Sequence, residues 1–175
     1  DNAAGDTING GVGNDTLNGL AGSDQLDGGA GDDTINAGGD NDTITASSGT
    51  DTYNGDSGSD TVNYDTLGQA ITAFEGNSTD IDTGAGTHTL NGIEIINGSD
   101  VDDTFYVRND MGGLGITNFN AGDETSEDTL NFSNYTESNI FVLANAIEGI
   151  TFTGFENYIF TSGVDTIHAG SGDAI

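Results

Sequence analysis

Apolar residues recur once every nine positions along the first third of the chain. Each one stands between two polar residues, most often a threonine before it and an asparagine after it. The recurring apolar residues are Ile8, Leu17, Leu26, Ile35, Ile44, Tyr53 and Val62. Because successive side chains of a strand point to opposite faces, a three-residue strand buries only its middle side chain. The pattern therefore predicts a series of short strands, each with one inward apolar residue.

The six residues between these strands predict turns. They are rich in glycine, asparagine and aspartate, as in GGVGND (10–15), which disfavours any helix. Glycines at the start of the turn allow a positive φ and bring backbone carbonyls close together. Two nine-residue units make an 18-residue coil, so strands two repeats apart stack in one sheet at about 4.8 Å. One ladder is predicted from Ile8, Leu26, Ile44 and Val62, and the facing ladder from Leu17, Ile35 and Tyr53.

An aspartate ends every one of these turns. Stacking in 18-residue coils separates them into an even column at one edge of the fold and an odd column at the other. The even column is Asp6, Asp24, Asp42 and Asp60, and the odd column is Asp15, Asp33 and Asp51. Stacked like charges repel unless a cation lies between them. Carboxylates and carbonyls, in a chain without cysteine, form the hard oxygen shell that Ca²⁺ prefers.

Neighbouring turns of one column predict five calcium sites. The pairs are Asp6 with Asp24, Asp24 with Asp42, Asp42 with Asp60, Asp15 with Asp33, and Asp33 with Asp51. If Ca²⁺ stands at about ten times Kd, each independent site adds roughly 1.4 kcal/mol, or about 7 kcal/mol in total. That sum is comparable to the stability of a whole domain, so we expect calcium to be a condition of folding.

The whole unit reads G-G-x-G-x-D-x-U-x, where U is the apolar residue, and it resembles the RTX (haemolysin-type calcium-binding) family. The resemblance covers residues 1–63 with strong motifs and the rest with weak ones. It implies an all-β, right-handed parallel β-roll in which the sixth-place aspartates and turn carbonyls bind Ca²⁺. The carbonyl ligands expected from it are Gly10, Gly11, Gly13, Gly19, Gly22, Gly28, Gly29 and Gly31.

Charge excludes several classes of partner. The net charge is −29, with Arg108 as the single basic residue and no lysine. Nothing neutralises phosphates, so nucleic-acid binding is not expected, and anionic membrane surfaces would repel the chain. No apolar run has the length of a transmembrane segment. Without cations, an acidic and glycine-rich chain of this kind should be largely disordered.

The composition changes after Asn63, because Tyr53 is the only one of the 13 aromatic residues that precedes it. The nine-residue frame becomes intermittent there, with His88 in the aspartate position of TGAGTHTLN (83–91) and Ala174 in that of the last turn. Weaker candidate ligands are Asp103, Asp128 and Asp165. Alternating apolar residues predict short strands in 70–74 and 139–147, and 113–124 resembles a strand followed by a turn. We predict a regular roll over 1–63 that continues into a degenerate, widened roll with buried aromatics over 64–175.

Three residues invite a sharper interpretation. His88 could bind a transition metal, or it could mark a turn that has lost a calcium ligand. Glu94 and Glu156 each precede a repeat aspartate by nine residues and could form a glycosidase pair. Their equivalent places favour a structural role instead, such as accepting turn amides or joining a calcium shell. No Ser/His/Asp arrangement, cysteine nucleophile or phosphate loop is present, so no catalytic function is expected.

The sequence therefore predicts a non-catalytic, calcium-dependent folding module. The resemblance implies a large secreted bacterial adhesin, toxin or exoenzyme, exported by type I secretion and folded outside the cell or at its surface. The chain begins and ends inside repeats, which predicts a segment of a longer protein. An alternative is a module that binds a glycan or surface polymer through exposed aromatics. A weaker one is ice binding through an outward Thr/Asn ladder.

Overall fold

The fold was analysed in a computed structural model. It describes residues 4–75, 80–107, 114–122, 127–133, 141–143, 146–147, 150–154, 157–159 and 167–169. Every regular element in these ranges is a β-strand. Polar residues flank one apolar residue in most of them, and glycine and asparagine separate them, so strands rather than helices form.

Nineteen strands follow one another in the described part of the chain. The regular repeats supply β1 (Thr7–Val12), β2 (Thr16–Ala21), β3 (Gln25–Ala30), β4 (Thr34–Gly39), β5 (Thr43–Thr45), β6 (Thr52–Ser57) and β7 (Thr61–Asn63). The aromatic half supplies β8 (Thr72–Ala73), β9 (Asp80–Asp82), β10 (Thr87–Asn91), β11 (Ile95–Asn97), β12 (Thr104–Tyr106), β13 (Asn118–Asn120), β14 (Thr129–Asn131), β15 (Phe141–Leu143), β16 (Ala146–Ile147), β17 (Ile150–Thr153), β18 (Asn157–Ile159) and β19 (Ile167–Ala169).

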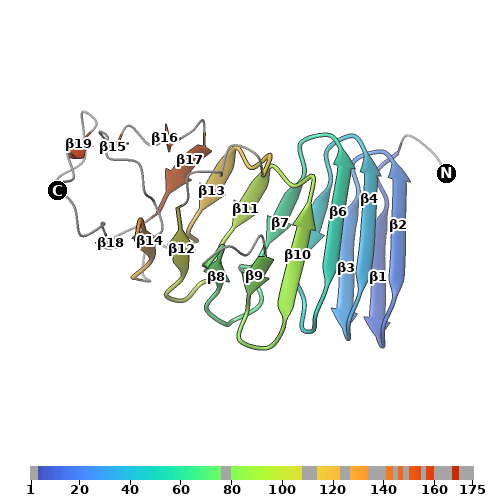
Figure 1. Ribbon diagram of the computed structural model, residues 1–175. Helices are drawn as coiled ribbons and strands as arrows, with labels where there is room; N and C mark the ends of the chain where they lie inside the picture. Colours follow the sequence, from blue (N-terminus) through green and yellow to red (C-terminus); the bar gives the residue numbers. More distant parts are fainter. Residues whose placement is uncertain are drawn as a thin grey trace.

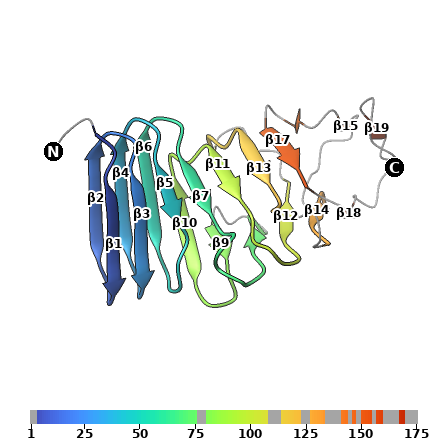
Figure 2. The ribbon, with the colours of Figure 1, turned by 180° about the vertical axis from the view of Figure 1, so that it is seen from behind.

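Two facing sheets run along the molecule (Figures 1 and 2), and β15 and β19 pair with each other in a separate two-stranded sheet. One sheet has the order β1-β3-β5-β7-β11-β13-β17-β16, and the other β18-β14-β12-β8-β9-β10-β6-β4-β2. Repeats two apart are parallel neighbours, so Ile8 pairs with Leu26, which pairs with Ile44, which pairs with Val62. Leu17, Ile35 and Tyr53 pair in the same way in the facing sheet. The predicted parallel β-roll and both of its ladders are confirmed.

The middle apolar residue of each repeat strand lies in the core between the sheets, and β4 buries Ala37 as well. Leu26, Ile35, Ile44 and Val62 are almost completely buried, whereas Ile8 in the first coil is half-buried. The flanking threonines and asparagines face outward. Among them the side-chain amides of Asn36, Asn54 and Asn91 each donate to the asparagine of the preceding coil at 2.9 Å. This hydrogen-bonded asparagine ladder ties neighbouring coils together on the outer face of one sheet.

The strands of the early repeats are longer than predicted. β1 to β4 and β6 each contain six residues rather than three, because strand pairing continues into the glycine-rich stretch. Gly11 pairs with Gly29 and Leu20 with Gly38, although all four have a φ between +82° and +113°. Residues in this left-handed region still stack when each coil repeats the same backbone, which the sequence period alone did not reveal.

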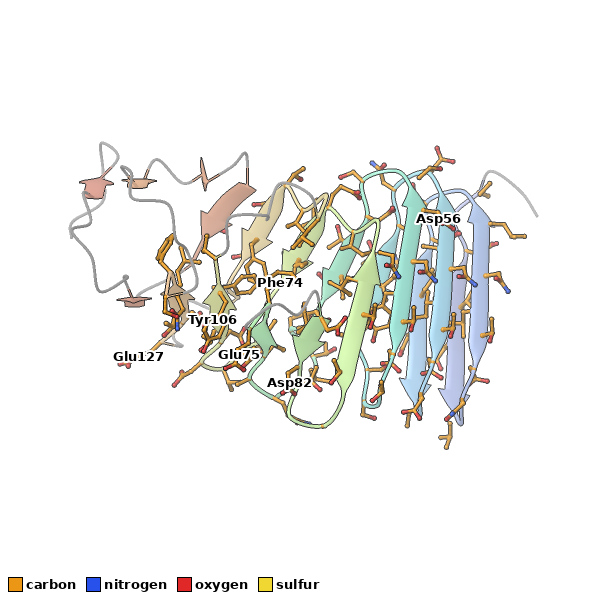
Figure 3. The ribbon with its side chains drawn as sticks, in the orientation of Figure 1. Asp56, Phe74, Glu75, Asp82, Tyr106 and Glu127 are labelled. Atoms are coloured by element: carbon orange, nitrogen blue, oxygen red, sulfur yellow. The ribbon has the colours of Figure 1, made fainter. Side chains whose placement is uncertain are left out.

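The two sheets continue into the aromatic half, where β10 and β11 join the stacks begun by the repeats. The coils are longer there, and Phe74, Phe105, Phe119 and Phe132 fill the interior, as the widened roll predicts. Figure 3 shows Phe74 between the sheets and Glu75 at the lower edge. Strand pairing departs from the parallel prediction where β9 pairs antiparallel with both β8 and β10.

The strands predicted in 70–74 and 139–147 are present as β8, β15 and β16, and 113–124 contains β13. The division of the chain into two parts at residue 63 stays a prediction. Both sheets contain strands from either side of this residue. Among the residues that the structure describes, no helix has the length and hydropathy to cross a membrane.

Candidate metal sites at the turn edges

The aspartates of each column are joined to one another through the backbone. From the second member of each column onward, one carboxylate oxygen of the aspartate, Oδ1, accepts the amide N–H of the aspartate 18 residues earlier. Asp6 donates to Asp24, Asp15 to Asp33, Asp24 to Asp42, Asp33 to Asp51 and Asp42 to Asp60, at 2.7–2.9 Å. The two predicted columns are therefore present, and Oδ1 of these five acceptor aspartates has a hydrogen-bond partner without any cation.

The second carboxylate oxygen, Oδ2, has a different environment. It is buried and without a hydrogen-bond partner in Asp15, Asp24, Asp33, Asp42 and Asp60. A buried carboxylate oxygen that lacks a partner costs several kilocalories per mole of desolvation, so a partner is strongly favoured. Five turns thus present the same unsatisfied negative atom, at both edges of the roll.

In four of these turns the first residue is a glycine, Gly10, Gly19, Gly28 or Gly55, whose backbone lies close to that oxygen. A methyl group added to Gly10 would lie 2.8 Å from Asp15 Oδ2 and 2.6 Å from the carbonyl oxygen of Gly28 in the next coil. The same added group would collide with Asp24 Oδ2 and the Ala37 carbonyl at Gly19, and with Asp33 Oδ2 at Gly28. In the Asp15 and Asp24 turns the cradle therefore lies between one coil's carboxylate and the next coil's carbonyl, whereas the Asp42 turn begins with Ala37 instead of glycine.

The residue at the second turn position distinguishes these five turns. It has a left-handed backbone in all of them, with φ between +65° and +113°, at Gly11, Leu20, Gly29, Gly38 and Asp56. Non-glycine residues pay a steric cost of about 1 kcal/mol or more in this region, so Leu20 and Asp56 are held there by the coil around them. Asp56 lies at the upper edge of β6 (Figure 3).

Asp51 has the column position but not the open cradle. Its Oδ2 accepts the Tyr53 hydroxyl at 2.8 Å and the Ser47 hydroxyl at 3.3 Å, and it lies 3.3 Å from Nε2 of His88. Ser47 holds the second turn position in place of glycine, and its φ is not positive. Protein groups therefore occupy the surroundings of this carboxylate, and we call the arrangement the Asp51 seal.

His88 completes the Asp51 seal from the next coil. Pairing of Thr89 with Thr52 and Leu90 with Tyr53 places His88 over Asp51, so its predicted position in the aspartate column is confirmed. Its ring is fully buried, with Nδ1 3.1 Å from the Tyr64 hydroxyl and the two rings stacked. Burial lowers the pKa of His88, although the Asp51 carboxylate acts in the opposite direction. At Nδ1 a neutral imidazole can accept from the Tyr64 hydroxyl, whereas Nε2 lies near Asp51 without making a hydrogen bond.

The Asp103 turn is closed in a similar way. The Ser99 amide donates to Asp103 Oδ2 and its hydroxyl to Oδ1, both at 2.7 Å, while the Ile71 amide donates to Oδ1. Ser99, like Ser47, holds the second turn position. Asp103 in turn donates its amide to Asp128 Oδ1 at 2.7 Å, which continues the column. Asp165, the third weaker candidate, lies outside the described residues.

Glu94 extends the even column beyond the repeats. The Asp60 amide donates to Glu94 Oε2 at 2.8 Å, and Ile95 of β11 pairs with Thr61 of β7. The expectation that Glu94 accepts a turn amide is confirmed, whereas Glu156 lies outside the described residues. The place of Glu94 in the aspartate column was not predicted from the sequence. The available signal is that Glu94 stands two residues before the inward Ile96, as the aspartate does in every repeat.

When no cation is bound, burial favours the protonated form of several column carboxylates. It raises the pKa of Asp60 to about 6, and the nearby charges of Asp42, Glu94 and Asp56 raise it further, against the Asp42 amide. Burial likewise raises the pKa of Asp42, and that of Asp103 to about 6. Folding without a cation therefore disfavours the charged form of these carboxylates, which a bound cation would favour.

This chemistry fits a calcium ion. In the described part of the chain, no three His, Cys, Asp or Glu side chains gather at one point. A cation in a cradle would therefore take most of its ligands from backbone carbonyls, with carboxylates from stacked aspartates. Oxygen-only coordination of this kind suits Ca²⁺ rather than Zn²⁺ or Cu²⁺.

The predicted carbonyl ligands fall at three places of the turn. Gly10, Gly19 and Gly28 are first-place residues beside the carboxylates, Gly11 and Gly29 are second-place residues, and Gly13, Gly22 and Gly31 are fourth-place residues with positive φ. Four of the five predicted pairs contain an open cradle, those that begin at Asp15, Asp24, Asp33 and Asp42. Asp6, in the first coil, is half-buried and does not show the same buried, unpartnered oxygen.

Comparison with protein families matches the chain to the RTX calcium-binding nonapeptide repeat, in four copies over residues 2–35 and 27–62. Neither a curated protein nor a solved structure matches the chain. The matched residues contain six of the seven coil strands of the regular roll in full and all seven column aspartates. Residues 2–62 are therefore RTX calcium-binding nonapeptide repeats, folded as a parallel β-roll.

Proposed function

We propose that the chain is a structural module whose roll folds when Ca²⁺ enters the open cradles of the repeat turns. The observation that carries this proposal is the recurrence of a buried carboxylate oxygen without a partner at Asp15, Asp24, Asp33 and Asp42. Each cradle joins two coils, so a cation bound in it offsets repulsion within a column and closes a turn at once. The carboxylates and turn carbonyls are the ligands, and the fold carries no catalytic role.

Calcium dependence also suggests where the module works. A chain with a net charge of −29 remains open while Ca²⁺ is scarce and folds where it is plentiful. We infer that this module belongs to a secreted or cell-surface bacterial protein, such as an adhesin, toxin or exoenzyme, exported unfolded by type I secretion. The RTX repeats in residues 2–62 support this inference.

Circular dichroism during a Ca²⁺ titration tests the proposal, with Mg²⁺ and EGTA beside it. The β-sheet signal should appear with Ca²⁺ and should be small in EGTA or in Mg²⁺ alone, because Mg²⁺ demands a tighter octahedral shell. A chain that is fully folded in EGTA would refute calcium-gated folding.

Binding of a glycan or surface polymer remains an alternative. Tyr53, Tyr64, Phe74, Phe105, Phe119 and Phe132 are buried, and Tyr106 is half-buried. The aromatic side chains that the structure describes thus offer no exposed stacking platform. A glycan titration of the calcium-loaded chain separates the two functions, since binding at millimolar glycan would favour the alternative.

A further inference from the structure

Along the even edge, the roll crosses from its repeats into the aromatic half through the stacked pair of Asp60 and Glu94. After β7 the chain passes into the other sheet and returns to this one at β11, where the amides of Glu94 and Ile95 donate to the Asp60 carbonyl at 3.2 and 2.9 Å. The Asp60 amide donates to Glu94 Oε2 at 2.8 Å. These are the contacts that stacked aspartates make within the repeats, so Glu94 occupies an aspartate position.

The space beside this pair has the features of an open cradle. Asp60 is completely buried, and its Oδ2 has no hydrogen-bond partner. A methyl group added to Gly55 would lie 2.6 Å from that oxygen and would collide with the Gly92 carbonyl of the returning coil. Asp56, at the second turn position, has the left-handed φ of +65° found in the other open turns.

The charges around Asp60 also favour a cation. Asp42, Asp56 and Glu94 all act on its carboxylate, and no basic side chain is recorded near it in the described part of the chain. The returning coil contributes a glutamate and the Gly92 carbonyl, neither of which lies in the matched repeats 2–62. Repeat spacing therefore does not reveal this pair, because 34 residues separate its members.

We propose that a calcium ion binds between Asp60 and the coil that ends at Glu94, with Asp60 Oδ2, the Gly92 carbonyl and the Glu94 carboxylate among its ligands. This inference rests on the proposed function of the repeat cradles and extends it beyond them. The site fastens the first coil of the aromatic half to the last repeat along the even edge. Along the odd edge, the Asp51 seal makes the corresponding connection without a cation.

Two substitutions at one position test the site. Glu94→Gln keeps an oxygen that can accept the Asp60 amide but removes the charge, whereas Glu94→Asp keeps the charge in the residue type of the column. Calcium stoichiometry is measured by isothermal titration calorimetry. Glu94→Gln should bind one ion fewer than the wild-type chain, and Glu94→Asp should bind the full number. Glu75→Gln, an exposed site at the opposite edge (Figure 3), should also bind the full number.

Hydrogen exchange supplies a second readout, since protection of the Asp60 and Glu94 amides should depend on Ca²⁺ less steeply in Glu94→Gln than in Glu94→Asp. Failure of Glu94→Gln to fold at calcium that folds Glu94→Asp would also support the site, because the two differ in charge. Equal behaviour of the two variants would overturn it. If the wild-type chain bound no calcium, the proposed function would fail, whereas an unchanged count in Glu94→Gln would remove this site alone.

Discussion

Asp33 and Asp51 occupy consecutive places in one column, yet their carboxylates have opposite surroundings. Both are buried, and both accept the amide of the preceding aspartate through Oδ1. Oδ2 of Asp33 has no partner, whereas Oδ2 of Asp51 is held by Tyr53 and Ser47 and faces His88. The aspartate itself therefore does not make a cation site. The second turn residue and the following coil determine whether a carboxylate stays open.

The largest effect is expected when an open turn loses its carboxylate. Asp33→Ala should weaken two cradles, because Oδ2 lines its own cradle and Oδ1 orders the Asp15 turn before it. At Ca²⁺ about ten times Kd, the loss of two sites lowers the free energy of unfolding by roughly 3 kcal/mol. Calorimetric calcium counts and urea unfolding would measure this. Asp6→Ala, in the half-buried first coil, should cost less than half as much, and equal costs would contradict the stacking.

Truncation of the Asp51 seal should destabilise the chain without changing its calcium content. His88→Ala removes a fully buried ring that contacts Asp51, Tyr53 and Tyr64. We expect the free energy of unfolding to fall by about 2 kcal/mol, with the calcium count unaltered. Urea unfolding at saturating Ca²⁺, paired with calorimetry, tests both parts. Loss of an ion from His88→Ala would show that this turn is also a calcium site.

A lower pH should stabilise the calcium-free fold and destabilise the calcium-bound fold. The folded pKa of Asp60, about 6, lies above its unfolded value near 3.8. Its contribution to the metal-free fold is therefore fully present below about pH 4 and is lost as the pH rises through 6. In EGTA, the β-sheet signal should increase as the pH falls from 7 to 5. In Ca²⁺, the same change should weaken the fold as protons displace the ion, and parallel trends would contradict the open cradle.

The smallest effect is expected at the serine that closes the Asp103 turn. Ser99→Ala removes the hydroxyl that donates to Asp103 Oδ1 and keeps the hydrogen bond from the Ser99 backbone amide to Oδ2. The free energy of unfolding should fall by about 1 kcal/mol. Thermal unfolding in saturating Ca²⁺ measures it, with the exposed Ser23→Ala as the matched control. Equal midpoints for the two variants would mean that the hydroxyl contributes nothing to the closed turn.

The nine-residue period was sufficient to predict the local geometry. It predicted both ladders, both aspartate columns and the place of His88, because each depends only on the 18-residue coil. The antiparallel strand β9 was not predicted, since it is set by how the chain between residues 64 and 87 returns to the stack. Such an insert is fixed by packing between distant residues, which carries no short sequence period.

Open and closed turns could have been separated from the sequence in part. Ser47 and Ser99 both replace the residue that precedes each repeat aspartate by four, a substitution visible in the repeat alignment. Leu20 and Asp56 could not have been assigned in this way, because no glycine stands at either position, although aspartate tolerates the left-handed backbone better than leucine does. There the stacked coils impose the conformation, and only the structure reveals it.

The hydrogen bonds that link aspartates of successive coils allow different numbers of residues between the coils. They require that the chain returns to the sheet in register. Asp42 and Asp60 are 18 residues apart and Asp60 and Glu94 are 34 apart, yet both pairs make the same amide-to-carboxylate bond. The requirement is that each returning coil places its carboxylate beside the amide of the preceding coil. Whole segments inserted between coils should therefore cost their neighbours little, whereas deletion of one residue inside a turn should misalign the bonds between that coil and the coils on either side.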